Sequence, residues 1–228
     1  PSSAASDVYK RQTYNNAITL SADTSLSTTN SAVQFVSTLN SANATARALS
    51  VNVGTSNVTF TGAVGGSQGL GNISLTSTGT STFSAAVIAA ALTQNSVTGT
   101  TAINGSSITT TNAQIYGNAI TLGAATTLNT TNSNITFSST LNSSTTARNL
   151  TLNVGSGAVS FAGIVGGTLA LGDVNSTAAT TTNSAAISGM GAYSITGAAT
   201  ISSAISGVTS ISVSAATSIG ANITTTGS

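Results

Sequence analysis

Several residue types that supply chemistry are missing from this chain of 228 residues. It contains no cysteine, histidine or glutamate, and charged residues make up only 3% of it. The absence of cysteine excludes disulfides and thiolate metal sites, and the absence of histidine excludes imidazole ligands and histidine-based acid–base catalysis. A formal net charge of +1 is too small to drive binding to nucleic acid through phosphate neutralisation. We therefore expect no enzyme, no metal, no cofactor and no nucleic-acid partner.

Long apolar runs are also missing. The longest, residues 85–92, is far shorter than the roughly 18 residues of a spanning helix, so we expect no membrane insertion by this segment. Helix formation is disfavoured because Glu is absent and Lys nearly so, while β-branched Thr, Val and Ile are plentiful. A hydrophobic content of 39% argues against disorder. Small polar residues and turn formers fill most of the remaining positions, which suits an extended solenoid.

The first residues differ in character from the rest. Residues 7–12 read DVYKRQ and hold three of the seven charged residues. The string resembles a translated transposon-end adapter from a sequencing library, so residues 1–11 are interpreted as a foreign, disordered assembly scar. A charged natural N-terminus is the alternative. Because the chain does not begin with Met, we expect it to be a fragment of a longer protein.

A long repeat covers most of the chain. Residues 14–20 (YNNAITL) match residues 116–122 (YGNAITL) at an offset of 102, and Thr45-Ala46-Arg47 matches Thr146-Ala147-Arg148 at an offset of 101. Residues 12–113 form the first copy and residues 114–228 the second. We expect the two copies to belong to one continuous solenoid.

A shorter period lies inside each copy. Phe35, Phe60 and Phe83 are 25 and 23 residues apart, and Phe137 and Phe161 are 24 apart. Apolar and polar residues alternate around them, which predicts short strands with one face buried. Short strands that recur about every 23 residues, separated by Gly, Asn and Ser, predict an all-β, parallel, right-handed β-helix solenoid of roughly nine coils.

An antiparallel sandwich or barrel is the competing fold, but Asn104-Gly105 is the single Asn-Gly hairpin signal in the chain. For the solenoid we expect these inward positions: Ile18, Leu20, Val33, Phe35, Leu49, Val51, Val58, Phe60, Ile73, Leu75, Ile120, Leu122, Ile135, Phe137, Leu150, Leu152, Val159, Phe161, Ile211 and Val213.

Residues 14–24 (YNNAITLSADT) and 58–66 (VTFTGAVGG) resemble repeat units of filamentous-haemagglutinin-like bacterial exoproteins and autotransporter passengers. The resemblance spans nearly the whole chain after residue 12. It implies a structural shaft of an adhesin, secreted or displayed outside the outer membrane of a Gram-negative bacterium. It also implies an outer-membrane translocation partner and host-cell or surface glycans or proteins as binding partners.

Few residues are candidates for a site. Arg47 and Arg148 occupy equivalent repeat positions and are read either as glycan or carboxylate contacts along the rod or, preferably, as exposed turn residues. Asp23 and Asp173 are isolated, whereas a carbohydrate-active β-helix needs clustered carboxylates. The sequence therefore predicts no catalytic, cofactor-binding or metal residue.

Two further patterns leave alternatives open. The glycine pairs at 65–66 and 166–167 lack the lysine and helix of a phosphate-binding loop and are interpreted as tight corners. Threonine runs such as Thr109-Thr110-Thr111 raise ice binding as a second function, although their positions vary between coils. A polysaccharide-active enzyme is the third and least favoured alternative.

Overall fold

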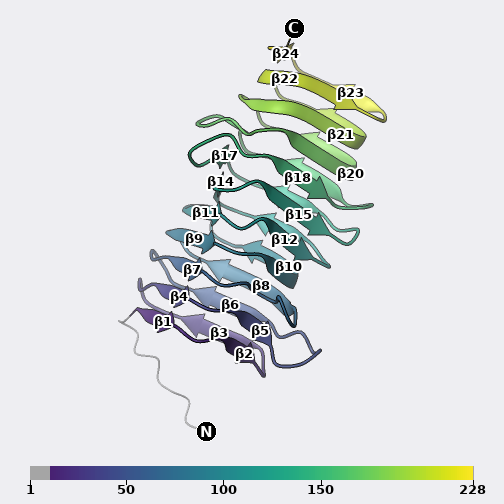
Figure 1. Cartoon of the computed structure of the whole chain (residues 1–228). Coiled ribbons are helices and arrows are strands. Elements are labelled where there is room, and N and C mark those ends of the chain that lie inside the picture. Colours follow the sequence, from purple (N-terminus) through teal and green to yellow (C-terminus); the bar gives the residue numbers. More distant parts are fainter. Residues whose placement is uncertain (1–10, 228) are drawn as a thin grey trace.

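The structure is a computed structural model that describes residues 11–227, and these residues form strands and turns with no helix. The chain winds into a β-solenoid of about ten turns (Figure 1). The predicted parallel β-helix is therefore confirmed, with about one coil more than expected. Of the segment interpreted as foreign, residues 1–10 lie outside the described residues, and Arg11 is exposed.

Each coil has three faces, which we name A, B and C in the order in which the chain visits them. Face A contains β1 (Gln12–Tyr14), β4 (Val33–Phe35), β7 (Val58–Phe60), β9 (Thr80–Phe83), β11 (Thr100–Ile103), β14 (Ala119–Leu122), β17 (Leu141–Ser143), the start of β22 (Ile205–Val213) and β24 (Ile223–Thr225). Face B contains β2 (Ile18–Leu20), β5 (Leu39–Ser41), the start of β10 (Val87–Gln94), β12 (Ser107–Thr110), β15 (Thr126–Thr130), β18 (Leu150–Asn153), the first parts of β20 (Val174–Asn183) and β21 (Met190–Ile201), and the rest of β22. Face C contains β3 (Thr24–Ser27), β6 (Leu49–Asn52), β8 (Leu70–Thr76), the end of β10, β13 (Gln114–Tyr116), β16 (Ile135–Phe137), β19 (Ala158–Phe161), the second parts of β20 and β21, and β23 (Thr217–Ile219).

Face A gives the coil boundaries, because one column of paired residues runs along it through the whole rod. The column begins at Gln12 and continues through Val33, Val58, Ser81, Thr101, Ile120, Leu141, Val165, Ile187 and Ile205 to Ile223. Coils are 18 to 25 residues long. We number them 1 to 10 from Gln12.

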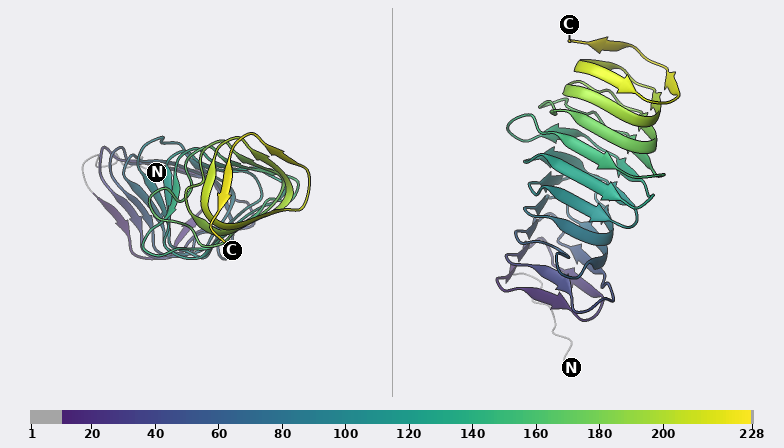
Figure 2. Two further views of the ribbon diagram at one scale, coloured as in Figure 1. Left: turned by 90° about the horizontal axis from the view of Figure 1, so that it is seen from above. Right: turned by 45° about the vertical axis from the view of Figure 1, so that its right-hand side comes forward.

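Strands pair in parallel throughout the described chain, which excludes the antiparallel sandwich. Asn104-Gly105 connects β11 on face A to β12 on face B, so it forms a corner of coil 5 and not a hairpin. The rod has its two chain ends at opposite ends, and successive coils are displaced sideways when viewed from above (Figure 2).

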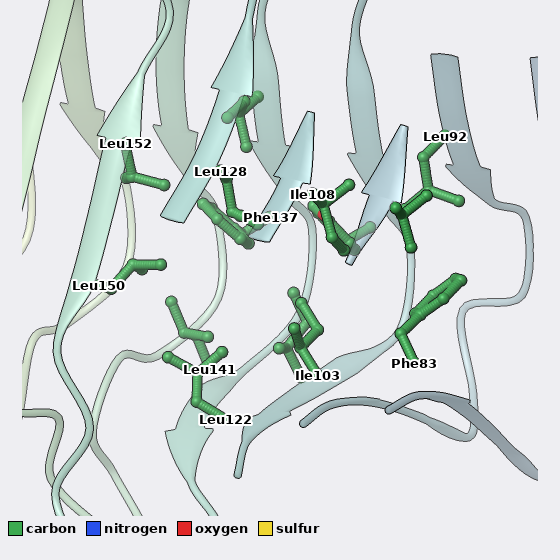
Figure 3. Close-up of a cluster of buried hydrophobic side chains, with 14 of the residues drawn as sticks. Phe83, Leu92, Ile103, Ile108, Leu122, Leu128, Phe137, Leu141, Leu150 and Leu152 are labelled. Atoms are coloured by element: carbon green, nitrogen blue, oxygen red, sulfur yellow. The ribbon is translucent and has the colours of Figure 1, made fainter. Parts of the chain in front are cut away.

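The core is a single apolar column inside the three faces. Side chains from all three faces meet in it, including Phe83 from face A, Ile108 from face B and Leu92 from face C (Figure 3). Of the predicted inward positions, all are buried except Ile18, Ile211 and Val213, which are partly buried and pack against the core. Alternation of apolar and polar residues in each strand therefore selected the buried face correctly.

Aromatic side chains stack along the core in two separate columns. Tyr14, Phe35, Phe60 and Phe83 stack on face A in coils 1 to 4, with ring centroids 5.0 to 5.3 Å apart. The second column stands on face C in coils 5 to 7, with centroids 5.0 and 5.4 Å apart, and consists of Tyr116, Phe137 and Phe161. Since the first copy starts on face A and the second on face C, the long repeat contains a non-integral number of coils.

Candidate functional site

Both described aspartates cap the backbone of the next coil. Asp23 Oδ1 accepts a hydrogen bond from the Ala48 N–H at 2.9 Å, and Asp173 Oδ1 accepts one from the Ala192 N–H at 2.9 Å. Asparagine does the same at equivalent corners: Asn134 Oδ1 accepts from the Ala158 N–H at 2.9 Å. Such side chains satisfy backbone donors where the ladder is interrupted at a corner. The aspartates thus have a structural role that needs an oxygen acceptor and no charge.

The two aspartates lie far apart in the rod. Asp23 lies at the corner between faces B and C in coil 1, and Asp173 lies at the corner between faces A and B in coil 8. Seven coil spacings of about 4.8 Å place them roughly 34 Å apart along the axis. The described residues contain no group of three His, Cys, Asp or Glu side chains that could hold a metal. The arrangement offers no acid–base pair.

Arg47 and Arg148 also lie apart, although they are equivalent in the repeat. Arg47 precedes β6 at the corner between faces B and C, whereas Arg148 precedes β18 at the corner between faces A and B. The Nε atom of each is buried without a hydrogen-bond partner. Because they lie on different corners, they do not form a row of positive charge along the rod.

The first glycine of each pair lies in close contact with the backbone of the next coil. Gly65 has a φ of +73°, and a Cβ there would lie 2.0 Å from the Ile88 carbonyl oxygen in the next coil. Gly166 has a φ of +69°, and its Cβ would lie 1.8 Å from the Gly189 carbonyl oxygen. Their N–H groups bond to Leu39 and Leu141 carbonyls at 2.7 and 2.8 Å. These glycines are structural corners, as the sequence indicated.

A file of outward hydroxyl groups runs along face C. Strand pairing aligns one outward position from coil 1 to coil 10, and nine of its ten residues are Ser or Thr, with Ile115 as the exception. The residues of this hydroxyl file are Ser25, Ser50, Ser74, Thr93, Ile115, Thr136, Ser160, Thr182, Thr200 and Ser218. Sequence reasoning described the threonine positions as variable because unequal coil lengths hide this alignment.

Face B carries a partly self-bonded ladder instead. Asn129 Nδ2 donates to Thr109 Oγ1 at 3.2 Å, and Asn153 Nδ2 donates to Asn129 Oδ1 at 2.9 Å. Amide and hydroxyl ladders of this kind stabilise neighbouring coils. Face C has a similar bond, since Asn95 Nδ2 donates to Ser74 Oγ at 2.7 Å.

Two shallow grooves, both open to solvent, flank residues 42–48. One, of about 280 Å³, crosses face C in coils 1 to 3 and has Asp23 as its single charged lining residue. The other, of about 250 Å³, has no charged lining residue and contains Leu70 and the 44% exposed Ile88. The first groove is lined mostly by polar residues, including Ser25, Ser50 and Ser74, whereas the second is lined mostly by apolar ones.

A buried polar cluster interrupts the apolar core where the two repeat copies meet. Gln94 Nε2 donates to Thr101 Oγ1 at 2.9 Å, and Thr101 Oγ1 donates to Asn118 Oδ1 at 2.7 Å. Gln94 Oε1 and Asn118 Nδ2 are buried without a partner. Sequence reasoning missed this cluster, although a glutamine at an inward strand position was a visible signal.

Two tyrosines are fully buried in the core. The Tyr116 hydroxyl donates to Gln114 Oε1 at 2.9 Å, and the Tyr193 hydroxyl donates to Asn183 Oδ1 at 3.1 Å. Burial raises the pKa of both hydroxyls well above the ordinary value. These phenols are neutral structural donors and are not accessible for chemistry.

No membrane-spanning helix and no matching known protein points to a function for the described residues. Within residues 11–227 no helix has the length and apolar character needed to cross a membrane. Comparisons with known proteins give no matching family model, no similar curated protein and no similar solved structure.

Proposed function

We propose that this chain is a non-catalytic structural shaft segment of a secreted or surface-displayed bacterial adhesin. The observation that carries the proposal is the paired column on face A, which runs through every coil from Gln12 to Ile223. Each inner coil is hydrogen-bonded to the coils on both of its sides, so the rod resists bending. A shaft of this kind holds an attached binding domain at a fixed distance.

The surface chemistry supports the same role. Arg11, Asp23, Arg47, Arg148 and Asp173 are the only charged residues at positions 11–227, and both aspartates are used as corner caps. Uncharged hydroxyls and amides cover the faces, which suits a spacer that stays in water without attracting charged molecules. The proposal includes weak contacts with host-cell glycans and a location outside the outer membrane of a Gram-negative cell. It also includes passage through a translocation partner in that membrane.

A spacer is tested by its length. Since the chain has no cysteine, Thr19→Cys and Thr196→Cys place two spin labels on face B, eight coils apart. We expect a distance of roughly 38 Å or somewhat more, and about 5 Å more when residues 120–140 are duplicated to add one coil. Pulsed electron paramagnetic resonance measures both distances. An unchanged or broadly distributed distance after the insertion would contradict a rigid shaft.

The adhesin role is tested by display. The segment is placed between a cell-surface anchor and a binding domain of known ligand, with and without the duplicated coil. We expect capture of the ligand to depend on segment length and to be unaffected by Ser218→Ala on the outer surface. Strong binding of cells or glycans by the purified chain alone would contradict a passive shaft.

Ice binding is a second candidate, favoured by the hydroxyl file on face C. Regularly spaced hydroxyls can order water into a lattice, and nine of the ten coils contribute a hydroxyl to this file. Thermal hysteresis of the purified chain is the measurement, with Thr182→Tyr disrupting face C and Thr121→Tyr as the control on face A. Absence of hysteresis in the unmodified chain would exclude this function.

A further inference from the structure

The core of coils 4 and 5 is more polar than the core elsewhere in the rod. Of the sixteen buried polar residues of the described chain, seven lie in these two coils: Ser81, Gln94, Ser96, Thr101, Thr110, Gln114 and Asn118. In the column of paired residues on face A, Ser81 and Thr101 are the only polar residues from Val33 to Ile223. Coils 4 and 5 therefore bury less apolar surface against each other than their neighbours do.

Three of these polar side chains carry an atom without a hydrogen-bond partner. Ser81 Oγ, Gln94 Oε1 and Asn118 Nδ2 are buried and unpaired. A buried polar atom that has lost its water and gained no partner destabilises the folded chain. The side-chain packing of coils 4 and 5 is therefore weakened twice, by the polar residues themselves and by their incomplete bonding.

The aromatic stacking is interrupted at the same level. The column on face A ends at Phe83, which is followed by Ile103 (Figure 3). The column on face C begins at Tyr116, which is preceded by Gln94. Stacked rings add to the stability of the coils that they join. They do so within coils 1–4 and within coils 5–7, and none of the described ring pairs joins the two groups.

Coil 8 also contains buried polar side chains, but most of their atoms are paired. The hydroxyls of Ser176 and Thr181 bond to each other at 2.8 Å, and the Tyr193 hydroxyl donates to Asn183 Oδ1 at 3.1 Å. In coil 8 a single side-chain atom, Asn183 Nδ2, is buried without a partner. Polar residues in the core thus weaken coil 8 less than they weaken coils 4 and 5.

Backbone pairing continues through coils 4 and 5 on all three faces. There β9 pairs with β11, and β10 pairs with both β12 and β13. The folded rod is therefore continuous, and the difference lies in side-chain packing alone. In a solenoid, stability is approximately the sum of the stabilities of the coils and of the contacts between neighbours. Cooperative unfolding is expected to divide where that sum is locally lowest.

We propose that coils 4 and 5 are a built-in break point, at which the rod divides into two cooperative units. Coils 4 and 5 open together with coils 1–3, while coils 6–10 stay folded. The larger unit is the more stable because stability grows with the number of stacked coils. A rod of this kind lengthens at one defined place under load. The inference stands independently of the proposed shaft function, because it concerns the order of unfolding.

The first test follows hydrogen exchange of the full chain by mass spectrometry at urea concentrations below the main unfolding transition. We expect peptides from residues 33–119 to lose protection at a lower urea concentration than peptides from residues 120–204. Coils 1 and 10 are left out of the comparison because terminal elements fray. Simultaneous loss in both regions, loss in the reverse order, or a boundary at coil 8 would overturn the proposal.

The second test fills the polar part of the core with apolar side chains of similar shape. Replacing all partners together leaves no new unpaired atom. The combined variant carries four substitutions: Ser81→Ala, Gln94→Met, Thr101→Val and Asn118→Leu. We expect residues 33–119 and 120–204 to lose protection at the same urea concentration. The matched control, Ser176→Ala with Thr181→Val in coil 8, is expected to keep the difference between the two regions. A folded combined variant with an unchanged difference would refute the break point.

A milder variant covers the case in which the combined one does not fold. Ser81→Ala removes one unpaired buried atom and adds no volume. It is expected to raise the urea concentration at which residues 33–119 lose protection, and to leave that of residues 120–204 unchanged. Far-UV circular dichroism shows which variants are folded. Equal effects of Ser81→Ala on both regions would show that they unfold as one unit.

Discussion

Tyr14 and Tyr116 occupy the same position in the long sequence repeat but lie on different faces of the solenoid. Tyr14 begins the aromatic stack on face A in coil 1, and Tyr116 begins the stack on face C in coil 5. In both, the hydroxyl donates to the glutamine two residues earlier, at 3.0 Å to Gln12 and 2.9 Å to Gln114. The tyrosine–glutamine hydrogen bond is thus repeated, but the face of the solenoid that carries it is not. Residues that correspond in the two repeat copies therefore do not line up along the rod.

The corner caps predict that aspartate charge is dispensable. Asp173→Asn keeps an oxygen acceptor for the Ala192 N–H, so we expect the free energy of unfolding to be almost unchanged. Asp173→Ala removes that acceptor and is expected to cost about 1 kcal/mol. Urea unfolding followed by circular dichroism measures both. Equal destabilisation by Asn and Ala would mean that the charge itself matters.

The paired glycines at the first corner should respond differently to alanine. Gly65→Ala places a Cβ 2.0 Å from a backbone oxygen at a positive φ, so we expect a loss of more than about 1 kcal/mol. At Gly66 the nearest atom to an added Cβ is 3.6 Å away, so Gly66→Ala is expected to change stability by less than about 0.5 kcal/mol. Thermal and urea unfolding compare the two variants. Similar effects would show that the corner rearranges freely.

The buried polar cluster depends on one hydroxyl. Thr101→Val removes the group that accepts from Gln94 and donates to Asn118, leaving two more buried amide atoms without partners. We expect a loss of about 1 to 3 kcal/mol. Thr121→Val on the outer side of face A is the control and should be nearly neutral. The free energies come from urea unfolding, and a neutral Thr101→Val would show that the hydroxyl adds nothing to the core.

Buried tyrosines predict sensitivity to alkali. Burial raises the pKa of Tyr116 and Tyr193 above the ordinary value of 10.0, because the folded core disfavours the phenolate. Their contribution to stability is complete below about pH 10 and is lost as the pH rises beyond it. We expect their phenolate absorbance to appear only together with the loss of the β-sheet signal. Ionisation of all four tyrosines in a folded chain would contradict this expectation, and Tyr116→Phe identifies the signal of that residue.

Composition and residue pattern were sufficient to predict the fold class and the buried face. Alternation of apolar and polar residues has a period of two in any strand, so the inward positions from Leu20 to Phe161 were readable without coordinates. Turn residues at roughly regular intervals limit the strands to a few residues. Because one coil of such strands cannot bury its apolar side alone, the coils stack on one another and share a core.

The end of each coil and the alignment of residues around the axis could be read from the strand pairing alone. Coils range from 18 to 25 residues because corners tolerate insertions, so spacing in sequence does not give position on a face. This is why Arg47 and Arg148 separate onto different corners while the hydroxyl groups of face C come into line. Partners such as Asn129 and Asn153 meet across neighbouring coils, and that meeting depends on the stacking of coils, which no local pattern encodes.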